Sequence, residues 1–206
     1  MKKIKISSCL EKMKEFVDQE SIFDCEYKNI NIESIYSLAK IDGCKFVNCK
    51  FIDCQLDQLE CVDVIFDHCE FVHTHFFNSV LCRTHFIGCR ISGIQISDSL
   101  IQDSLFRNCK GNYCDFGASK LKDCFLSQND FSESSFVQCE FKSTIIAHCD
   151  FTSTEWFNTN LKGIDFSTSN ISKIGVSSDS IPGVIVNDEQ ALEFVKILGV
   201  VIKSDV

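Results

Sequence analysis

The sequence is short of basic residues and has no stretch that suits a membrane. Its 206 residues include 20 Lys and Arg against 29 Asp and Glu, for a net charge of −9. Direct binding of nucleic acid needs Lys and Arg to neutralise phosphates, so this balance argues against it. No apolar run approaches the ~20 residues of a transmembrane helix, and no apolar segment of a secretory signal follows Met1–Lys5. We therefore expect a cytoplasmic protein that contacts neither nucleic acid nor membrane directly.

The motifs that carry catalysis or bind phosphate are also missing. The sequence has no Gly-rich phosphate loop and no nucleophile elbow. His73 and His75 form an H-x-H pair with no evident third ligand. The most closely spaced cysteines are five residues apart, as in Cys44, Cys49 and Cys54, whereas structural zinc sites usually space theirs two to four apart. We expect no enzyme, no cofactor and no metal site, and we interpret the histidines as solvated surface residues.

What the sequence does contain is a period of five that runs from Ile41 to Val186. Every fifth residue has a large apolar side chain, with Cys61 and Gly111 as the exceptions. The position two residues earlier is mostly small and holds most of the 14 cysteines, while the other three positions are mainly polar. This spacing fits neither a helix nor an ordinary strand. It accounts for the 19 phenylalanines and the single proline, and it indicates an internal repeat.

Four such units would make a square coil of twenty residues, with residue n stacked on residue n+20. A repeat of this kind cannot bury its apolar side alone, so successive coils must stack to close a core. Phe46, Phe66, Phe86 and Phe106 would then form one column. The sequence predicts an all-β solenoid of about seven to eight coils, spaced by the ~4.8 Å between neighbouring strands.

The repeat unit resembles that of the pentapeptide repeat family. The segments Cys44-Lys45-Phe46-Val47-Asn48 and Cys149-Asp150-Phe151-Thr152-Ser153 show the pattern small–x–Phe–x–x. The resemblance covers about residues 39–186 and implies a right-handed quadrilateral β-helix. Left-handed β-helix acyltransferases use a period of six, which this sequence does not show.

The sequence divides into residues 1–21 as an N-terminal cap, 22–186 as the β-helix and 187–206 as a C-terminal helix and strand. In the cap, Leu10, Met13, Phe16 and Val17 recur at helical spacing after Ser8, which predicts a short helix. Residues 22–32 step by five in a different register and should form a first coil, which joins the main register at Tyr36 or Ile41. Near the C-terminus, Asn187 should cap a helix that runs to Leu198 and ends at Gly199, before a strand at 200–202.

The cysteines occupy positions that call for a small apolar filler, and free cysteine behaves as one. Cys49, Cys69, Cys89 and Cys109 should stack in one column, with Cβ atoms slightly too far apart for an unstrained bond. We expect reduced thiols. At Gly111 the missing side chain predicts a local bend, a cavity or compensation by Tyr113.

Acidic residues gather in two neighbouring columns of the predicted rod. The column centred on Leu56, Phe76 and their successors has no Lys or Arg, and the column centred on Phe51 and its successors adds more acids against four basic residues. We take one set as a candidate partner-binding face: Asp57, Asp98, Asp115, Asp130, Glu133, Asp150 and Glu155. A charge run of this kind can equally be a solvated surface.

Within the family, the chain is most similar to the quinolone-resistance (Qnr) type, but without loops between coils. That resemblance implies a DNA mimic that binds DNA gyrase or topoisomerase IV and modulates it or protects it from quinolones. The lack of loops puts protection in doubt. It also implies a homodimer through the C-terminal tail, where the candidate interface residues are Leu192, Phe194, Val195, Leu198, Val200 and Ile202. The alternatives are a monomer capped by this tail, and a scaffold that binds another partner through apolar outward residues such as Phe77 and Phe157.

Overall fold

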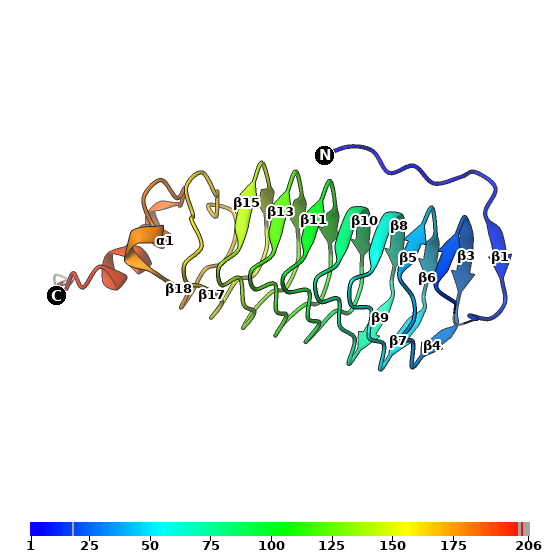
Figure 1. Cartoon of the computed structure of the whole chain (residues 1–206). Helices are drawn as coiled ribbons and strands as arrows, with labels where there is room; N and C mark the ends of the chain where they lie inside the picture. Colours follow the sequence, from blue (N-terminus) through cyan, green and yellow to red (C-terminus); the bar gives the residue numbers. More distant parts are fainter. Residues whose placement is uncertain (18, 202, 204–206) are drawn as a thin grey trace.

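The protein is a four-sided parallel β-solenoid of about eight turns with one helix at its C-terminal end (Figure 1). This computed structural model describes residues 1–17, 19–201 and 203. The four sides, faces A to D, follow one another along each coil. Face A contains the units centred on Ile41 and every twentieth residue after it, and faces B, C and D contain those that begin at Phe46, Phe51 and Leu56.

Faces A and B have the most regular strands, and together with β1 they form one 13-stranded sheet. Two strands turn the corner between these faces, β8 (Glu60–Asp67) and β10 (Val80–Ile87). The other strands of face A are β2 (Ser21–Phe23), β5 (Lys40–Asp42), β11 (Leu100–Gln102), β13 (Lys120–Lys122) and β15 (Glu140–Lys142). The other strands of face B are β3 (Cys25–Lys28), β6 (Lys45–Val47), β12 (Leu105–Arg107), β14 (Phe125–Ser127) and β16 (Ile145–Ala147).

Faces C and D pair mostly through single bridges. The strands of face C are β4 (Asn31–Glu33), β7 (Lys50–Ile52) and β9 (Glu70–Val72), and those of face D are β17 (Glu155–Trp156) and β18 (Gly175–Val176). Elsewhere on these faces one residue of each unit bridges to the residue twenty positions on, as Asp115 does to Ser135.

The predicted register is confirmed. Phe46 pairs with Phe66, Phe66 with Phe86, and Phe86 with Phe106, each twenty residues apart. The first coil is one residue shorter, because Ile22 pairs with Ile41. The main register resumes by Ile41, while Tyr36 is 60% exposed and is not an inward position.

The interior consists of stacked apolar side chains with small residues between them. The rings of Phe46, Phe66, Phe86 and Phe106 stack with centroids 5.2, 4.9 and 4.7 Å apart. Such close packing leaves no channel through the rod. All 14 cysteines, which lie within the described residues, are free thiols, as predicted.

The space left by the missing side chain at Gly111 is filled by residues of the same column and not by a neighbour in sequence. A Cβ at this position would lie 3.0 Å from both Ile91 Cγ1 and Phe131 Cε1. Tyr113 is 58% exposed and donates its hydroxyl to Glu133, so the suggestion that Tyr113 compensates for the glycine was wrong.

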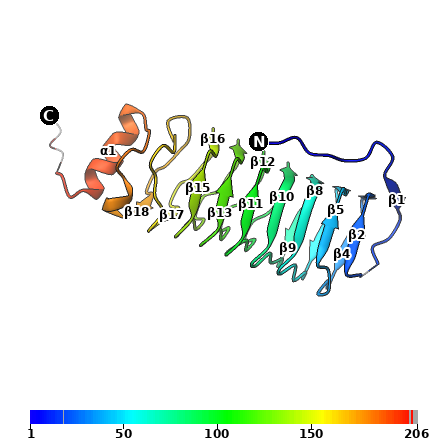
Figure 2. The same cartoon turned by 45° about the horizontal axis from the view of Figure 1, so that its top comes forward.

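The predicted N-terminal helix was also wrong. Residues 11–13 form β1 (Glu11–Met13), which pairs in parallel with β3, and the Phe16 ring lies 5.5 Å from that of Tyr27 at the end of the core. Before β1 the chain runs back in extended form along the outside of the rod, as far as β11 and β12 (Figures 1 and 2). The open end of a parallel stack provides backbone partners for a strand, and this tertiary pairing overrides helical spacing.

The C-terminal helix is confirmed. After a short 3₁₀ turn, η1 (Ser178–Ser180), the helix α1 spans Asp188–Ile197. Asn187 and Gln190 form a reciprocal capping box, and Gly199 follows with φ +77°. Phe194 is buried against the last coil. Val200 and Val201 are not in a strand, and Ile202 lies outside the described residues, so the predicted strand at 200–202 is absent where the structure describes it.

Candidate functional site

Five of the seven predicted acidic residues lie on the neighbouring faces C and D of three successive coils. Asp115 and Glu155 belong to one column of face D, joined through Ser135 by successive bridges. Asp130 and Asp150 bridge directly in the adjoining column of face C, and Glu133 occupies the corner between the two columns. We call these five residues the acidic edge. It involves three successive coils, so its first and last members are two strand spacings apart, about 9.6 Å at the ~4.8 Å spacing of strands.

Local hydrogen bonds orient several carboxylates of the acidic edge. Asp115 Oδ1 accepts the Gly117 amide at 2.8 Å, and Asp130 Oδ1 accepts the Ser132 hydroxyl at 2.7 Å. Glu133 Oε1 accepts the Tyr113 hydroxyl at 2.8 Å. In each case the second carboxylate oxygen remains available for a partner.

The acidic edge is not neutralised within the described part of the chain. None of its five carboxylates has a Lys, Arg or His nitrogen within 4.0 Å. Elsewhere acids of neighbouring coils are paired, as Glu70 is with Lys50 at 2.9 Å and Glu140 with Lys120 at 3.1 Å. Asp130 and Asp150 stand directly opposite one another, an arrangement that is destabilising for like charges. Among the described residues no ion pair offsets this cluster of negative charge, although Lys110 bridges to Asp130 in the same column.

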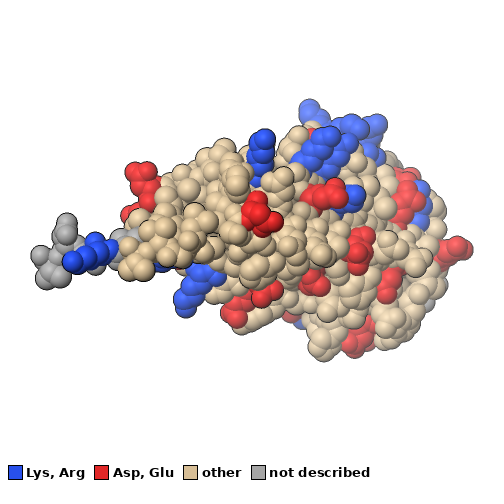
Figure 3. Space-filling view, turned by 60° about the vertical axis from the view of Figure 1, so that its left-hand side comes forward, with Lys and Arg blue, Asp and Glu red and all other residues tan. Residues whose placement is uncertain are grey.

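The other two predicted acids are not part of this cluster. Asp57 lies on face D three coils before Asp115 and accepts the Phe77 amide, and Asp98 lies at the corner between faces D and A. In the face C column, Arg90 and Lys110 precede Asp130. The acidic edge is thus confined to the C-terminal half of the rod. Figure 3 shows acidic side chains scattered over one view of the molecule, with most of the basic ones gathered at its upper margin.

The predicted dimerisation residues separate into exposed and buried members. Leu192, Leu198 and Val200 are about half exposed, and Val195 is partly buried. Phe194 packs into the core and is not available to a second copy. Ile202 lies outside the described residues.

Histidines and cysteines are dispersed. Among the described residues no three His, Cys, Asp or Glu side chains come together as metal ligands would, and His73 contacts Asp53 at 3.1 Å. Burial raises the pKa of the Cys44, Cys124 and Cys139 thiols to about 12. Thiols of this kind are packing groups and not nucleophiles. No helix in the described part of the chain is long and apolar enough to cross a membrane.

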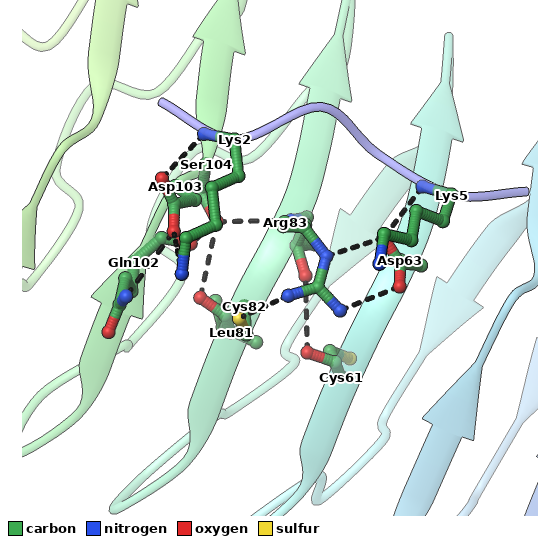
Figure 4. Close-up of polar contacts among 11 residues, drawn as sticks. Lys2, Lys5, Cys61, Asp63, Leu81, Cys82, Arg83, Gln102, Asp103 and Ser104 are labelled. Atoms are coloured by element: carbon green, nitrogen blue, oxygen red, sulfur yellow. Dashed lines mark hydrogen bonds and ion pairs between the residues drawn. The ribbon is translucent and has the colours of Figure 1, made fainter.

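Sequence reasoning missed a second site, at the corner between faces A and B. Here the extended residues 1–8, which we call the strap, lie across β8, β10 and β11 (Figure 4). The Lys2 amide donates to Asp103 Oδ1 at 2.6 Å and the Lys5 amide to Asp63 Oδ1 at 2.7 Å. Arg83 donates to both oxygens of Asp63 at 2.7 Å. The alternation of Lys and Ile in residues 2–6 was the available signal for an extended, one-sided segment.

The comparisons with known proteins agree with the repeat. A family model described as "Pentapeptide repeat region" matches residues 59–130. No curated protein sequence matches the chain.

Solved structures of several repeat proteins are similar in fold. QnrB1, a plasmid-mediated fluoroquinolone resistance protein, is 15% identical over 89% of this chain and 100% of its own, with a TM-score of 0.36. HetL, a pentapeptide repeat protein involved in heterocyst differentiation in Nostoc sp. strain PCC 7120, is 8% identical over 80% of this chain and 91% of its own, with a TM-score of 0.44. A thylakoid-lumen pentapeptide repeat protein of Arabidopsis thaliana is 16% identical over 65% of this chain and 72% of its own, at 0.37.

Proposed function

We propose that the chain is a pentapeptide repeat protein, a non-enzymatic rod whose acidic edge binds a basic surface of another protein. The observation that carries this proposal is the cluster of five carboxylates without ion-pair partners. A fold under selection only for stability gains nothing from like charges that face each other. A complementary basic surface would offset that repulsion and would steer association.

We further propose that the partner is a type II topoisomerase, DNA gyrase or topoisomerase IV, at a surface that otherwise binds DNA. Five charges over about 9.6 Å of the rod give roughly one per 2 Å, close to the ~1.7 Å per charge along duplex DNA. The choice of enzyme comes from the sequence resemblance to quinolone-resistance members and not from the geometry. Modulation of the enzyme or its protection from quinolones would follow from competition with DNA.

The test is DNA supercoiling by gyrase with added protein, at low and high salt, with and without a fluoroquinolone. One variant replaces the acidic edge with amides: Asp115→Asn, Asp130→Asn, Glu133→Gln, Asp150→Asn and Glu155→Gln. Asn and Gln keep the side-chain oxygens that accept the local hydrogen bonds. We expect the wild type to alter supercoiling or the drug response at low salt and much less at high salt, because salt screens exposed charges.

A control variant removes the same number of charges from acids that are already ion-paired: Asp42→Asn, Glu60→Gln, Glu70→Gln, Glu140→Gln and Glu193→Gln. The control should behave as the wild type, while the acidic-edge variant should lose at least tenfold in potency. No effect of the wild type at micromolar concentration would exclude gyrase. Binding that tolerates salt would favour the alternative, a scaffold that uses apolar residues such as Phe157, which is 41% exposed.

We also infer that two copies associate through the C-terminal tail. Leu192, Leu198, Val200 and Val201 are exposed on and just after α1, at one end of the rod. Exposed apolar groups gathered in this way mark interaction surfaces. A two-fold pairing of the tails would cover them and leave both acidic edges free.

A further inference from the structure

The backbone of the strap is held to the rod at two points. Two amide donors, those of Lys2 and Lys5, bind Asp103 and Asp63. The two aspartates are two coils apart, about 9.6 Å at the ~4.8 Å strand spacing. Three residues of extended polyproline-type chain span about 9.3 Å. The spacing of the two aspartates therefore matches the spacing of the amides at positions n and n+3 of an extended peptide.

The two aspartates form a built binding site. Asp63 is 6% and Asp103 is 2% exposed, although both project from the corner of the rod, and Arg83 fixes the carboxylate of Asp63. Beside them on face B, Leu105 is only 8% exposed, whereas Ile145, at the same position two coils further on and not reached by the strap, is 62% exposed. Ile4 and Ile6 of the strap are partly buried, and Ile6 lines the same hollow as Ile65. We call Asp63, Asp103, Ile65, His85 and Leu105 the strap site.

The strap does not satisfy every polar group beneath it. His85 lies in the face B column between Ile65 and Leu105. Its Nε2 atom is buried and has no hydrogen-bond partner within the described residues. Buried polar atoms are nearly always paired, so this nitrogen is available to a hydrogen-bonding side chain of an occupant.

We propose that the strap site binds an extended basic segment of another protein, and that the strap is its intramolecular competitor. The segment would offer amides at n and n+3, apolar residues that alternate with Lys or Arg, and one hydrogen-bonding side chain for His85. Charge complementarity with the two aspartates selects basic residues, as Lys2 and Lys5 of the strap show. The site is diagonally opposite the acidic edge, so this proposal does not rest on the topoisomerase proposal.

The strap can be released by proline, which removes an amide donor without opposing an extended backbone. The variant Lys2→Pro/Lys5→Pro deletes both donors to the aspartates. The matched control is Lys3→Pro, since the structure, over the residues it describes, gives the Lys3 amide no carboxylate partner. Circular dichroism of the two variants should match that of the wild type, because the solenoid lies outside the strap.

The probe is a peptide with the sequence of residues 1–8, labelled at its C-terminus and measured by fluorescence anisotropy. We expect it to bind Lys2→Pro/Lys5→Pro at least tenfold more tightly than the wild type or Lys3→Pro. Adding Asp103→Asn to the released variant should weaken binding at least tenfold. Equal affinity for released and wild-type protein, or no saturable binding to either, would overturn the proposal.

A second series of peptides tests the foreign occupant. The Ile4 position is replaced by Ser, Thr or Asn, and binding to the released variant is compared with and without His85→Phe. At least one replacement should bind several-fold more tightly than the parent peptide, and His85→Phe should abolish that gain. If no replacement gains affinity, the strap is the site's own ligand and the proposal of a foreign segment is wrong.

Discussion

At the scale of single residues, the small inward position does more than fill space. The Ser99 hydroxyl donates to the Phe76 carbonyl at 2.9 Å and accepts the Ser79 amide at 2.9 Å, so it links neighbouring coils. Asn129 makes the same two links, to Phe106 and Cys109. A cysteine such as Cys139 donates to the carbonyl of Phe116, but its sulfur is a weak acceptor.

We expect Ser99→Ala to lower the free energy of unfolding by about 2 kcal/mol, because a buried amide and a buried carbonyl lose their partner. Urea denaturation followed by circular dichroism measures this. Ser143→Ala is the control, because Ser143 is an exposed serine at a corner. This variant should change the free energy of unfolding by less than about 0.5 kcal/mol. Similar losses in both variants would mean that the inter-coil hydrogen bonds of Ser99 contribute little.

The sequence predicted which residues point inward, but not the conformation of the corners. The position two residues after each central residue has positive φ along the rod, as in Asn48 (+51°), Asp53 (+52°) and Asn78 (+53°). The Asn and Asp residues at this position were the available signal, because they tolerate the left-handed region better than other non-glycine residues.

At the scale of elements, the strap depends on two ionised carboxylates. Burial alone would raise the pKa of Asp63, but its hydrogen bonds to Arg83 and to the Lys5 amide lower it below 3.8. Burial would likewise raise the pKa of Asp103, and the Lys2 amide and Gln102 outweigh it. Because the pKa of each carboxyl is lower when the strap is docked, ionisation stabilises the docked strap at any pH above the ordinary carboxyl pKa. This stabilisation is lost as the pH falls through the lowered pKa values.

We therefore expect the strap to stay docked at neutral pH and to detach only below pH 3.8. The amide resonances of Lys2 and Lys5 should shift together on this descent, while that of Lys3 shifts less. His85, whose pKa burial and Arg107 lower, gains a proton in the same experiment, so His85→Phe is the control. Detachment well above the ordinary carboxyl pKa in both proteins would show that the aspartates do not hold the strap.

The N-terminal elements show where sequence reasoning failed. Leu10, Met13 and Phe16 have helical spacing, but Met13 pairs with Tyr27 across β1 and β3, and the Phe16 ring packs at a tilt against the ring of Tyr27. Nothing local in residues 1–17 indicates that Asp63 and Asp103 lie within reach. By contrast α1 was predictable because its capping box is entirely local.

At the scale of the whole molecule, the period of five predicted the rod, its register and the grouping of Asp130 with Asp150. It did not predict that Phe194 would be buried, because the fit of α1 against the last coil depends on how the chain leaves the repeat. Leu198 and Val200 of the tail are exposed, so substitutions at these two residues test whether two copies of the chain associate.

We expect the wild type to sediment as a dimer and Leu198→Glu/Val200→Glu to sediment as a monomer, since two charges buried at a small apolar contact oppose association. Val17→Glu is the control, because Val17 is also exposed (56%) but shortly follows β1, which lies at the opposite end of the rod. A wild type that sediments as a monomer at tens of micromolar would contradict the proposed pairing of the tails.

The exact stacking of residue n on n+20 also limits how such a chain can change length. An insertion of twenty residues within the repeat would lengthen the rod by one coil, about 4.8 Å, and leave every later side chain on its original face. An insertion of five would keep the core intact but rotate everything after it by a quarter turn. Placed between Asp103 and Asp115, it would move the acidic edge around the rod relative to the strap, so the angle between the two surfaces is encoded by counting residues.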